Sequence, residues 1–276
     1  MCPPSPSRPS QGVPERGRDA LSEWAKVVDC GDVPMSWLDK QAALKNLDQA
    51  HRRVSRKTPA NPDRSHAPRV LMLGGDHTTT LSALRSTRRR WGKVSMIHFD
   101  THLDTGNAGY GASLDYSNLD HGSFLHFAHE EDLTLNTSIH AGVHAALSEP
   151  KGDIENDVRC GFEFITNRDI DKLGVSSIIQ RIRQRVGNSY VYVSIDIDVL
   201  DPAFAPGTGT PVSGGWSPRE LLTILNGLNG LNVVGADVVE VAPVYDNKGE
   251  TTTLAAAQIA VSLIELLVAK PAGPRP

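Results

Sequence analysis

Short, uninterrupted apolar runs separated by helical patterns are the feature that most constrains the fold of this chain. Four such runs lie at residues 70–73, 94–99, 190–195 and 233–241, and two further strands are expected at 138–142 and 161–166. Strands that are apolar throughout, instead of at alternate positions, are typical of a parallel sheet covered by helices on both faces. The sequence therefore predicts an α/β fold, a three-layer α/β/α sandwich with a mostly parallel sheet.

The regions between and around these runs define the predicted domain. Helices are expected at 39–55, 74–91, 124–130, 171–186, from 217 onward, and at 251–268. Residues 1–24 are rich in Pro, Ser, Arg and Gly, which predicts a disordered, low-complexity N-terminus. Residues 25–270 are predicted to form one folded domain, with a short strand at 25–29.

Composition excludes several classes of partner. The formal net charge of −4 and a pI near 6.2 give no electrostatic basis for binding nucleic acid or an anionic membrane. Three scattered cysteines are too few for a disulfide framework or a thiolate metal site. No apolar run approaches about 18 residues and no secretory signal is present, so a cytoplasmic protein is expected.

Polar side chains follow the apolar run 94–99 at every second position, as Asp100, His102 and Asp104. On a straight strand, at roughly 3.3 Å per residue, the two aspartates would lie about 13 Å apart. They can therefore serve one site only if the chain curls, or if the ligands are shared between ions roughly 3.5–4 Å apart. The alternative is a polar strand end with solvated carboxylates.

Asp196 and Asp198 repeat this spacing where the run 190–195 ends. The carboxyl ends of parallel strands meet at one edge of a sheet, so four aspartates are expected there. Two like charges about 4 Å apart cost on the order of 4 kcal/mol at an effective dielectric near 20, so such a cluster requires protons or cations. With His77 and His102 added, the oxygen-rich donor set favours a pair of Mn²⁺ ions, with Mg²⁺, Co²⁺ or Ni²⁺ as alternatives.

Four motifs give this chain a resemblance to a known family. They are G-G-D-H at 74–77, H-F-D-T-H-L-D at 98–104, S-I-D-I-D-V-L-D-P-A-F-A-P-G-T-G-T-P at 194–211 and D-V-V-E-V-A-P at 237–243. In this order they resemble the ureohydrolase family of arginases, agmatinases and guanidino-acid hydrolases, and most of all its agmatinase and guanidinobutyrase branch. The resemblance extends over roughly residues 28–268 and implies an arginase-like fold.

The resemblance also implies a set of site residues. It makes two aspartates bridging ligands of a manganese pair and gives each ion two further ligands. The six implied ligands are the bridging Asp100 and Asp196, then His77 and Asp104 for one ion, and His102 and Asp198 for the other. Glu240 would hold the guanidinium of the substrate, and His121 would carry a proton near the leaving group.

The function implied is manganese-dependent hydrolysis of a linear guanidino compound, with agmatine giving putrescine and urea. The alternatives are 4-guanidinobutanoate, giving 4-aminobutanoate and urea, and then arginine. Deacetylation by a single zinc is disfavoured because six ligands fit a pair of ions. Family members usually assemble as trimers or hexamers, so a homo-oligomer is expected.

The chain also departs from the family pattern. The family's N-terminal G-V-P-x-D segment is not found, which leaves a truncated form or a non-catalytic, metal-binding paralogue as a further hypothesis. Val212, His144 and Gly106 stand where other residues are common, and are expected to affect which guanidino tail fits. His140 is expected to be a hydrogen-bonded core residue. Two further carboxylates, Asp237 and Asp246, are expected to be structural.

Overall fold

The computed structural model describes residues 24–36, 38–106 and 115–271. Within these residues six strands form one sheet in the order β1-β6-β5-β2-β3-β4, and every neighbouring pair is parallel. The strands are β1 (Val70–Leu73), β2 (Ser95–Phe99), β3 (Ser138–Val143), β4 (Phe162–Thr166), β5 (Tyr190–Asp196) and β6 (Asn232–Val239). The predicted parallel α/β fold is confirmed.

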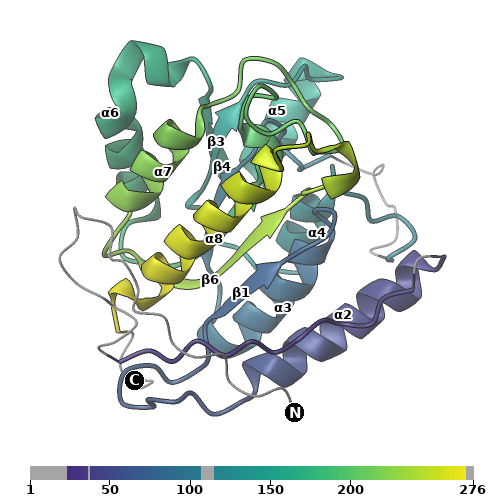
Figure 1. Ribbon diagram of the computed structural model, residues 1–276, viewed down its shortest axis with the longest axis vertical. Helices are drawn as coiled ribbons and strands as arrows, with labels where there is room; N and C mark the ends of the chain where they lie inside the picture. Colours follow the sequence, from purple (N-terminus) through teal and green to yellow (C-terminus); the bar gives the residue numbers. More distant parts are fainter. Residues whose placement is uncertain (1–23, 37, 107–114, 272–276) are drawn as a thin grey trace.

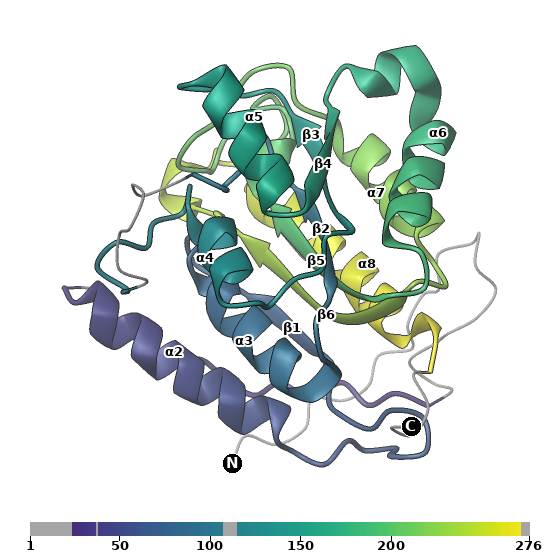
Figure 2. The same cartoon turned by 180° about the vertical axis from the view of Figure 1, so that it is seen from behind.

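Helices cover both faces of the sheet and complete the three layers. One layer is visible in front in Figure 1 and contains α6 (Asp169–Val186), α7 (Pro218–Gly227) and α8 (Thr251–Ala269). The other layer lies in front in Figure 2, where the molecule is seen from behind. It contains α2 (Lys40–Ser55), α3 (Thr79–Trp91), α4 (Phe124–Glu130) and α5 (Pro150–Arg159). The sandwich therefore buries the sheet on both sides, which explains why its strands lack alternation.

Each layer has its own hydrophobic core, and the alternation along a strand decides which core a side chain enters. Ile97 and Phe99 join the core under α6, α7 and α8, whereas Met96 joins the core under α2, α3 and α4. Because successive side chains point to opposite faces, His98 and Asp100 lie on the same face as Met96. The polar residues that follow β2 are thus directed towards the α3 side.

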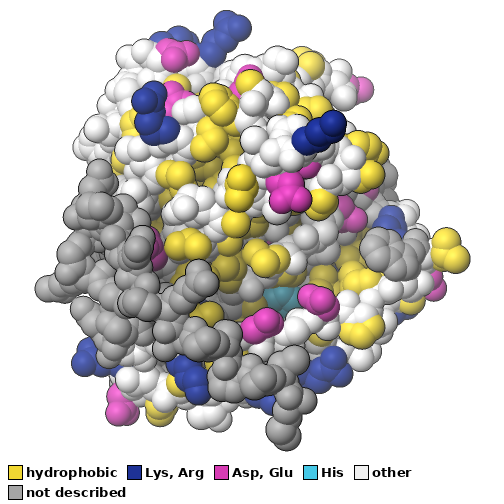
Figure 3. Space-filling view, viewed as in Figure 1, with side chains coloured by type: hydrophobic (Ala, Val, Ile, Leu, Met, Phe, Trp, Pro, Cys, Tyr) yellow, Lys and Arg dark blue, Asp and Glu magenta, His cyan; other side chains and the backbone are white. Residues whose placement is uncertain are grey.

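Helix α8 is long and apolar enough to cross a membrane by length and composition, with a mean hydropathy of 1.8. Its inner residues Ile259, Leu263 and Leu266 nevertheless pack in the core of the sandwich. Leu254 and Val261 on its outer side are exposed, and Figure 3 shows hydrophobic side chains distributed over this face. The helix itself was predicted, but the count of consecutive apolar residues did not mark it as a possible membrane span, because Gln258, Ser262 and Glu265 interrupt the run. One face of the helix thus packs on the sheet, and 39% of its apolar window is buried.

Two local features differ from the sequence-based expectation, and a third prediction falls outside the described residues. Residues 25–36 contain no strand, so the strand expected at 25–29 is wrong. Helix α5 was not predicted, because its apolar residues Ile154 and Val158 are at least partly exposed and give no buried stripe. The predicted disorder of residues 1–24 lies outside the described residues, apart from Trp24, whose indole N–H donates to the backbone oxygen of Val268 at 3.0 Å.

Candidate metal centre

His77 lies at the centre of a buried group of carboxylates. Its Nδ1 atom is 3.2 Å from Asp100 Oδ2, 3.1 Å from Asp104 Oδ2 and 3.2 Å from Asp196 Oδ2. Among the described residues, neither His77 Nδ1 nor Asp100 Oδ2 has a hydrogen-bond partner of good geometry. Two ligands at right angles and about 2.2 Å from an ion lie about 3.1 Å apart, so the spacing fits a shared divalent cation.

A second group adjoins the first and shares Asp100 with it. His102 Nδ1 lies 3.3 Å from Asp100 Oδ1 and 3.1 Å from Asp198 Oδ2. The two oxygens of Asp100 thus face different groups, as a carboxylate bridging two ions requires. The structure brings all six predicted ligands into these adjoining groups. Their role as ligands, and the bridging role of Asp196, stay predictions.

The backbone explains how residues four positions apart reach one point. Strand β2 ends at Phe99, and Asp104 then adopts a left-handed conformation with φ 56°. The chain bends at Thr101 and His102, and the left-handed conformation of Asp104, which is uncommon outside glycine, sets the direction of its side chain. Asp104 Oδ2 then faces the same His77 Nδ1 as Asp100 Oδ2. The chain therefore curls, which was one of the two arrangements expected from the spacing of these aspartates. Asp198 is placed by the short 3₁₀ helix η1 (Ile197–Val199), where its N–H donates to Asp196 Oδ1 at 2.8 Å.

The electrostatics of the cluster favour cations or protons. Burial, together with neighbouring carboxylates, raises the pKa of Asp196 well above its ordinary value, that of Asp104 to about 7 and that of Asp198 to about 6. Burial would also raise the pKa of Asp100, but the surrounding histidines hold it well below its usual range. For His102, burial lowers the pKa, yet Asp100 and Asp198 outweigh this and raise it to about 11. Divalent cations would replace the protons that this cluster otherwise attracts.

His98 belongs to the same cluster and was missed in the sequence. Its Nε2 lies 3.1 Å from Asp100 Oδ2, and its Nδ1 lies 2.8 Å from His140 Nδ1. His140 Nε2 in turn lies 2.9 Å from Asp157 Oδ1 on α5. Burial lowers the pKa of His98 to about 3. The available signal was its position two residues before Asp100, on the same face of the strand. His140 is a buried, hydrogen-bonded core residue, as expected.

Glu240 follows β6 and faces the same cluster. Its Oε1 accepts a hydrogen bond of 2.7 Å from the backbone N–H of His77, while its own N–H donates to Gly75 at 2.9 Å. It is half-buried and has a left-handed φ of 61°. Oε2 faces Gly209, where an added Cβ would lie 3.8 Å away. The structure thus places the predicted guanidinium-binding carboxylate against the backbone of a predicted ligand.

His121 lies in the exposed turn that precedes α4, and none of the contacts among described residues joins it to the ligands. Its predicted role in proton transfer stays a prediction. Two of the positions expected to affect specificity do meet, because His144 Nε2 lies 3.2 Å from the backbone oxygen of Val212. His144 Nδ1 also contacts Thr101 Oγ1 at 2.7 Å, and the Thr101 N–H donates to Asp198 at 3.2 Å. These two positions therefore adjoin the second ligand group.

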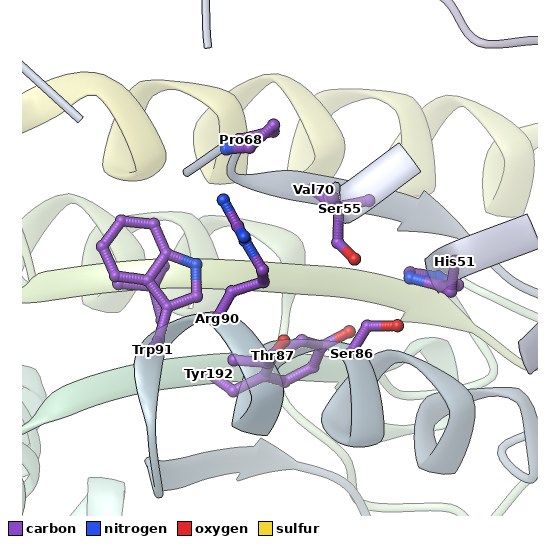
Figure 4. Close-up of a pocket in the computed structure, with 10 residues that line it drawn as sticks. His51, Ser55, Pro68, Val70, Ser86, Thr87, Arg90, Trp91 and Tyr192 are labelled. Atoms are coloured by element: carbon purple, nitrogen blue, oxygen red, sulfur yellow. The ribbon is translucent and has the colours of Figure 1, made fainter. Parts of the chain in front are cut away.

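A small cavity lies elsewhere, between α2, α3 and the sheet (Figure 4). His51, Ser86 and Tyr192 are among its lining residues, and none of the six predicted ligands is. His51 Nδ1 and Ser86 Oγ have no hydrogen-bond partner among the described residues. Burial lowers the pKa of His51 to about 4, so this histidine is neutral at pH 7. The cavity thus lies where these helices meet the sheet and is not part of the candidate metal centre.

The parallel sheet gathers buried histidines and carboxylates into two adjoining groups at its strand ends. The fold and the site therefore define a class of protein whose donor set fits a pair of divalent cations. Comparison with known families agrees with this class. The profile described as "Arginase family" matches residues 7–265, and the chain belongs to the arginase family. The match begins within the segment predicted to be of low complexity.

Individual relatives resemble the chain over most of its length. A Schizosaccharomyces pombe protein named "Putative agmatinase 1" is 48% identical over 91% of this chain and 66% of its own length. Agmatinase from Citrobacter koseri is 39% identical over 91% of this chain and 74% of its own length. Proclavaminate amidino hydrolase from Streptomyces clavuligerus superposes with a TM-score of 0.78 at 33% identity, covering 92% and 79% of the two chains. The chain spans slightly less than two thirds of the S. pombe relative.

Proposed function

We propose that this protein is a metal-dependent hydrolase that converts agmatine to putrescine and urea. The observation that carries the proposal is the contact between Glu240 and His77, which fixes a carboxylate beside the ligand groups. A guanidinium cation is bound best by a carboxylate, which accepts its N–H groups in charge-assisted hydrogen bonds. The choice of agmatine is supported by the names of the relatives from S. pombe and C. koseri.

The proposed cofactor is a pair of Mn²⁺ ions per chain. The donor set comprises four carboxylates and two imidazoles, which suits manganese better than a structural zinc. The six residues that would hold the ions are His77, Asp100, His102, Asp104, Asp196 and Asp198. When bound, such a pair lowers the pKa of water towards about 7 and so supplies hydroxide at neutral pH.

The residues of the chain would bind the substrate and orient its guanidino carbon for attack by hydroxide. Glu240 Oε1 is engaged by the His77 N–H, so Oε2 is the oxygen that would accept the guanidinium N–H groups. Gly209 has no side chain to cover that oxygen. Hydrolysis adds water to the guanidino carbon, breaks its bond to the alkylamine nitrogen, and delivers a proton to that nitrogen. Urea and a protonated amine leave, and the net charge is conserved.

His121 is the proposed proton carrier for the departing amine. The support is its position three residues before Phe124, whose ring stacks on His77 with centroids 4.4 Å apart. The turn that holds His121 is therefore connected to the ligand cluster through α4. An imidazole is suited to this role because its ordinary pKa lies near neutral pH.

The test is urea release by Mn²⁺-loaded protein from agmatine, 4-guanidinobutanoate and arginine. The expected result is the highest kcat/KM for agmatine; a preference for 4-guanidinobutanoate would select that alternative. Asp198→Asn is expected to abolish release, whereas Asp201→Asn, in the following loop, is its matched control. Urea from none of the substrates, in folded and metal-loaded protein, would contradict catalysis and favour a non-catalytic metal-binding role.

We also propose that the chain forms a homo-oligomer, a trimer or a hexamer, on the basis of its resemblance to the family. Light scattering on the full-length, metal-loaded protein measures the assembly directly. A molar mass of a single chain, 29.8 kDa, at assay concentration would contradict the proposal.

A further inference from the structure

A row of polar side chains crosses the sheet two residues before the predicted ligands Asp100 and Asp196. The register aligns His140 with His98, His98 with Ser194, and Ser194 with Asp237, on strands β3, β2, β5 and β6. All four residues are completely buried. Asp100 and Asp196 each lie two residues further along the same strands, so the row supports the ligand layer from below.

Asp237 accepts three hydrogen bonds from hydroxyl groups at the end of this row. Oδ2 accepts from Thr80 Oγ1 at 2.8 Å and from Tyr192 Oη at 2.7 Å, and Oδ1 accepts from Ser194 Oγ at 2.6 Å. Burial raises the pKa of Asp237, whereas these three hydrogen bonds favour its ionised form. An ionised carboxylate offers only acceptor sites, and each of these hydroxyl groups directs its single proton towards it. The proton of Ser194 is therefore committed to Asp237.

This commitment fixes the tautomer of His77. Ser194 Oγ lies 2.8 Å from His77 Nε2, and with its own proton on Asp237 it acts as the acceptor in that contact. His77 Nε2 must then carry a proton and donate it to Ser194. The neutral ring is left with a lone pair on Nδ1, the atom that faces Asp100, Asp104 and Asp196. Only this tautomer presents Nδ1 as a metal ligand.

The D-V-V-E motif thus contacts His77 from two directions. Asp237 acts through Ser194 on the imidazole, whereas Glu240 accepts the backbone N–H of the same residue. The ring also stacks on Phe124, with an interplanar angle of 26°. Asp237 and Glu240, three residues apart in the sequence, therefore both act on His77.

We propose that Ser194 and Asp237 are positioning residues that hold His77 in its metal-binding tautomer and orientation, and so set the affinity of one of the two metal positions. This inference rests on the metal dependence in the proposed function. His77 contacts only the first ligand group, whereas His102 and Asp198 belong to the second. The affinity of the second position is therefore expected to be independent of Ser194.

The experiment measures Mn²⁺ binding to the full-length protein, by competition with a chelator and by electron paramagnetic resonance. Ser194→Ala and Asp237→Asn are expected to weaken one of the two binding steps about 10–100-fold, the usual effect of losing a hydrogen-bond partner of a metal ligand. The other step is expected to change less than about 3-fold. At limiting Mn²⁺ the spectrum would then be that of a single ion instead of a coupled pair.

Matched controls separate positioning from general damage to the core. Thr80→Val and Tyr192→Phe each remove one hydroxyl group from Asp237 but leave Ser194 and His77 in contact, so both binding steps are expected to stay within about 3-fold of the wild type. Ser194→Thr restores the hydroxyl group and is expected to restore the weakened step. Should Asp237→Asn fail to fold, Ser194→Ala carries the test alone.

Two results would overturn the inference: wild-type affinity at both positions in Ser194→Ala, or equal weakening of both positions. Urea release enters neither comparison. A wild type that binds two Mn²⁺ ions but releases no urea would contradict the proposed hydrolase and leave this test intact.

Discussion

The backbone N–H of His77 donates a 2.7 Å hydrogen bond to Glu240 Oε1, across 163 residues of sequence. The contact connects the start of α3 with the end of β6, so the orientation of the carboxylate depends on the ligand cluster. Glu240 and Asp104 both hold left-handed backbone conformations, at φ 61° and 56°. Such conformations cost of order 1–3 kcal/mol in non-glycine residues, and both occur where a side chain must face the cluster.

Glu240→Gln is expected to reduce kcat/KM for agmatine about 100-fold, because a hydrogen bond to a charged group contributes roughly 1.5–3 kcal/mol. The amide oxygen of glutamine still accepts the His77 N–H, so Mn²⁺ affinity is expected to stay within about 3-fold. Urea-release kinetics and a metal titration check the two parts. An unchanged kcat/KM would remove Glu240 from the substrate site.

Asp196→Asn is expected to lose metal and most activity, because Asp196 lies 3.2 Å from His77 Nδ1 in the first ligand group. The matched control is Asp246→Asn, outside the cluster. Asp246 accepts the N–H groups of Thr252 and Thr253 at the start of α8. Asparagine caps a helix about as well as aspartate, so Asp246→Asn is expected to cost less than about 1 kcal/mol of stability and no metal. Elemental analysis of both variants checks this, and equal metal loss would contradict the assignment.

The sequence predicted the parts of this structure that depend on local pattern. The limits of β1 and α4 agree with the predicted ranges, because apolar runs and helical spacing are properties of the segment itself. The convergence of the ligands followed from the rule that parallel strands end at one edge. A curl of the chain between Asp100 and Asp104 was one of the two arrangements expected from their spacing in the sequence.

The polar row beneath the ligands could not be predicted in the same way. Ser194 and Asp237 meet only because β5 and β6 pair in one particular register, and a register shift separates Val191 from Tyr192 in that pair. Without the register, Asp237 was indistinguishable from a structural carboxylate. Helix α5 escaped prediction for a related reason, since its one buried residue is Asp157, whose partner His140 lies on a different element.

Removal of the metal is expected to lower the melting temperature, and by more at pH 8 than at pH 6. In the metal-free cluster burial raises the pKa of Asp104 to about 7 from an ordinary value of 3.8. A carboxyl group whose pKa is higher in the folded than in the unfolded state stabilises the fold while it is protonated. Its contribution to the free energy of unfolding declines as the pH rises from about 4 to about 7. At pH 8 the contribution is gone, whereas at pH 6 part of it persists.

Thermal melts with and without a chelator, at both pH values and after verified metal removal, measure this difference. Asp104→Asn removes the titrating group. The loss of melting temperature at pH 8 is therefore expected to differ less from the loss at pH 6 in this variant than in the wild type. A larger loss at pH 6 than at pH 8, or no loss at either, would be inconsistent with clustered carboxylates that a cation neutralises.

Gly142→Ala is expected to damage both stability and metal binding. Gly142, in β3, has φ 106°, and an added Cβ would overlap Val199 Cγ2 and approach the backbone oxygen of Asp100 to 3.3 Å. Gly230→Ala is the matched control, because Gly230 also has a positive φ of 90° but has nothing within 4 Å of the added atom. Both variants incur roughly 1–2 kcal/mol of backbone strain, so the difference between them isolates the steric overlap.

That difference is expected to exceed about 1 kcal/mol, within the range for overpacked cores, and only Gly142→Ala is expected to weaken Mn²⁺ binding. The reason lies in Asp100, whose N–H donates to Ala141 at 3.2 Å and whose two oxygens face the two ligand groups. A shift of β3 against Asp100 therefore disturbs both metal positions at once, unlike the loss of Ser194. Denaturant unfolding and Mn²⁺ titration measure the two effects. Equal destabilisation of the two variants with unchanged metal affinity would show that β3 does not constrain Asp100.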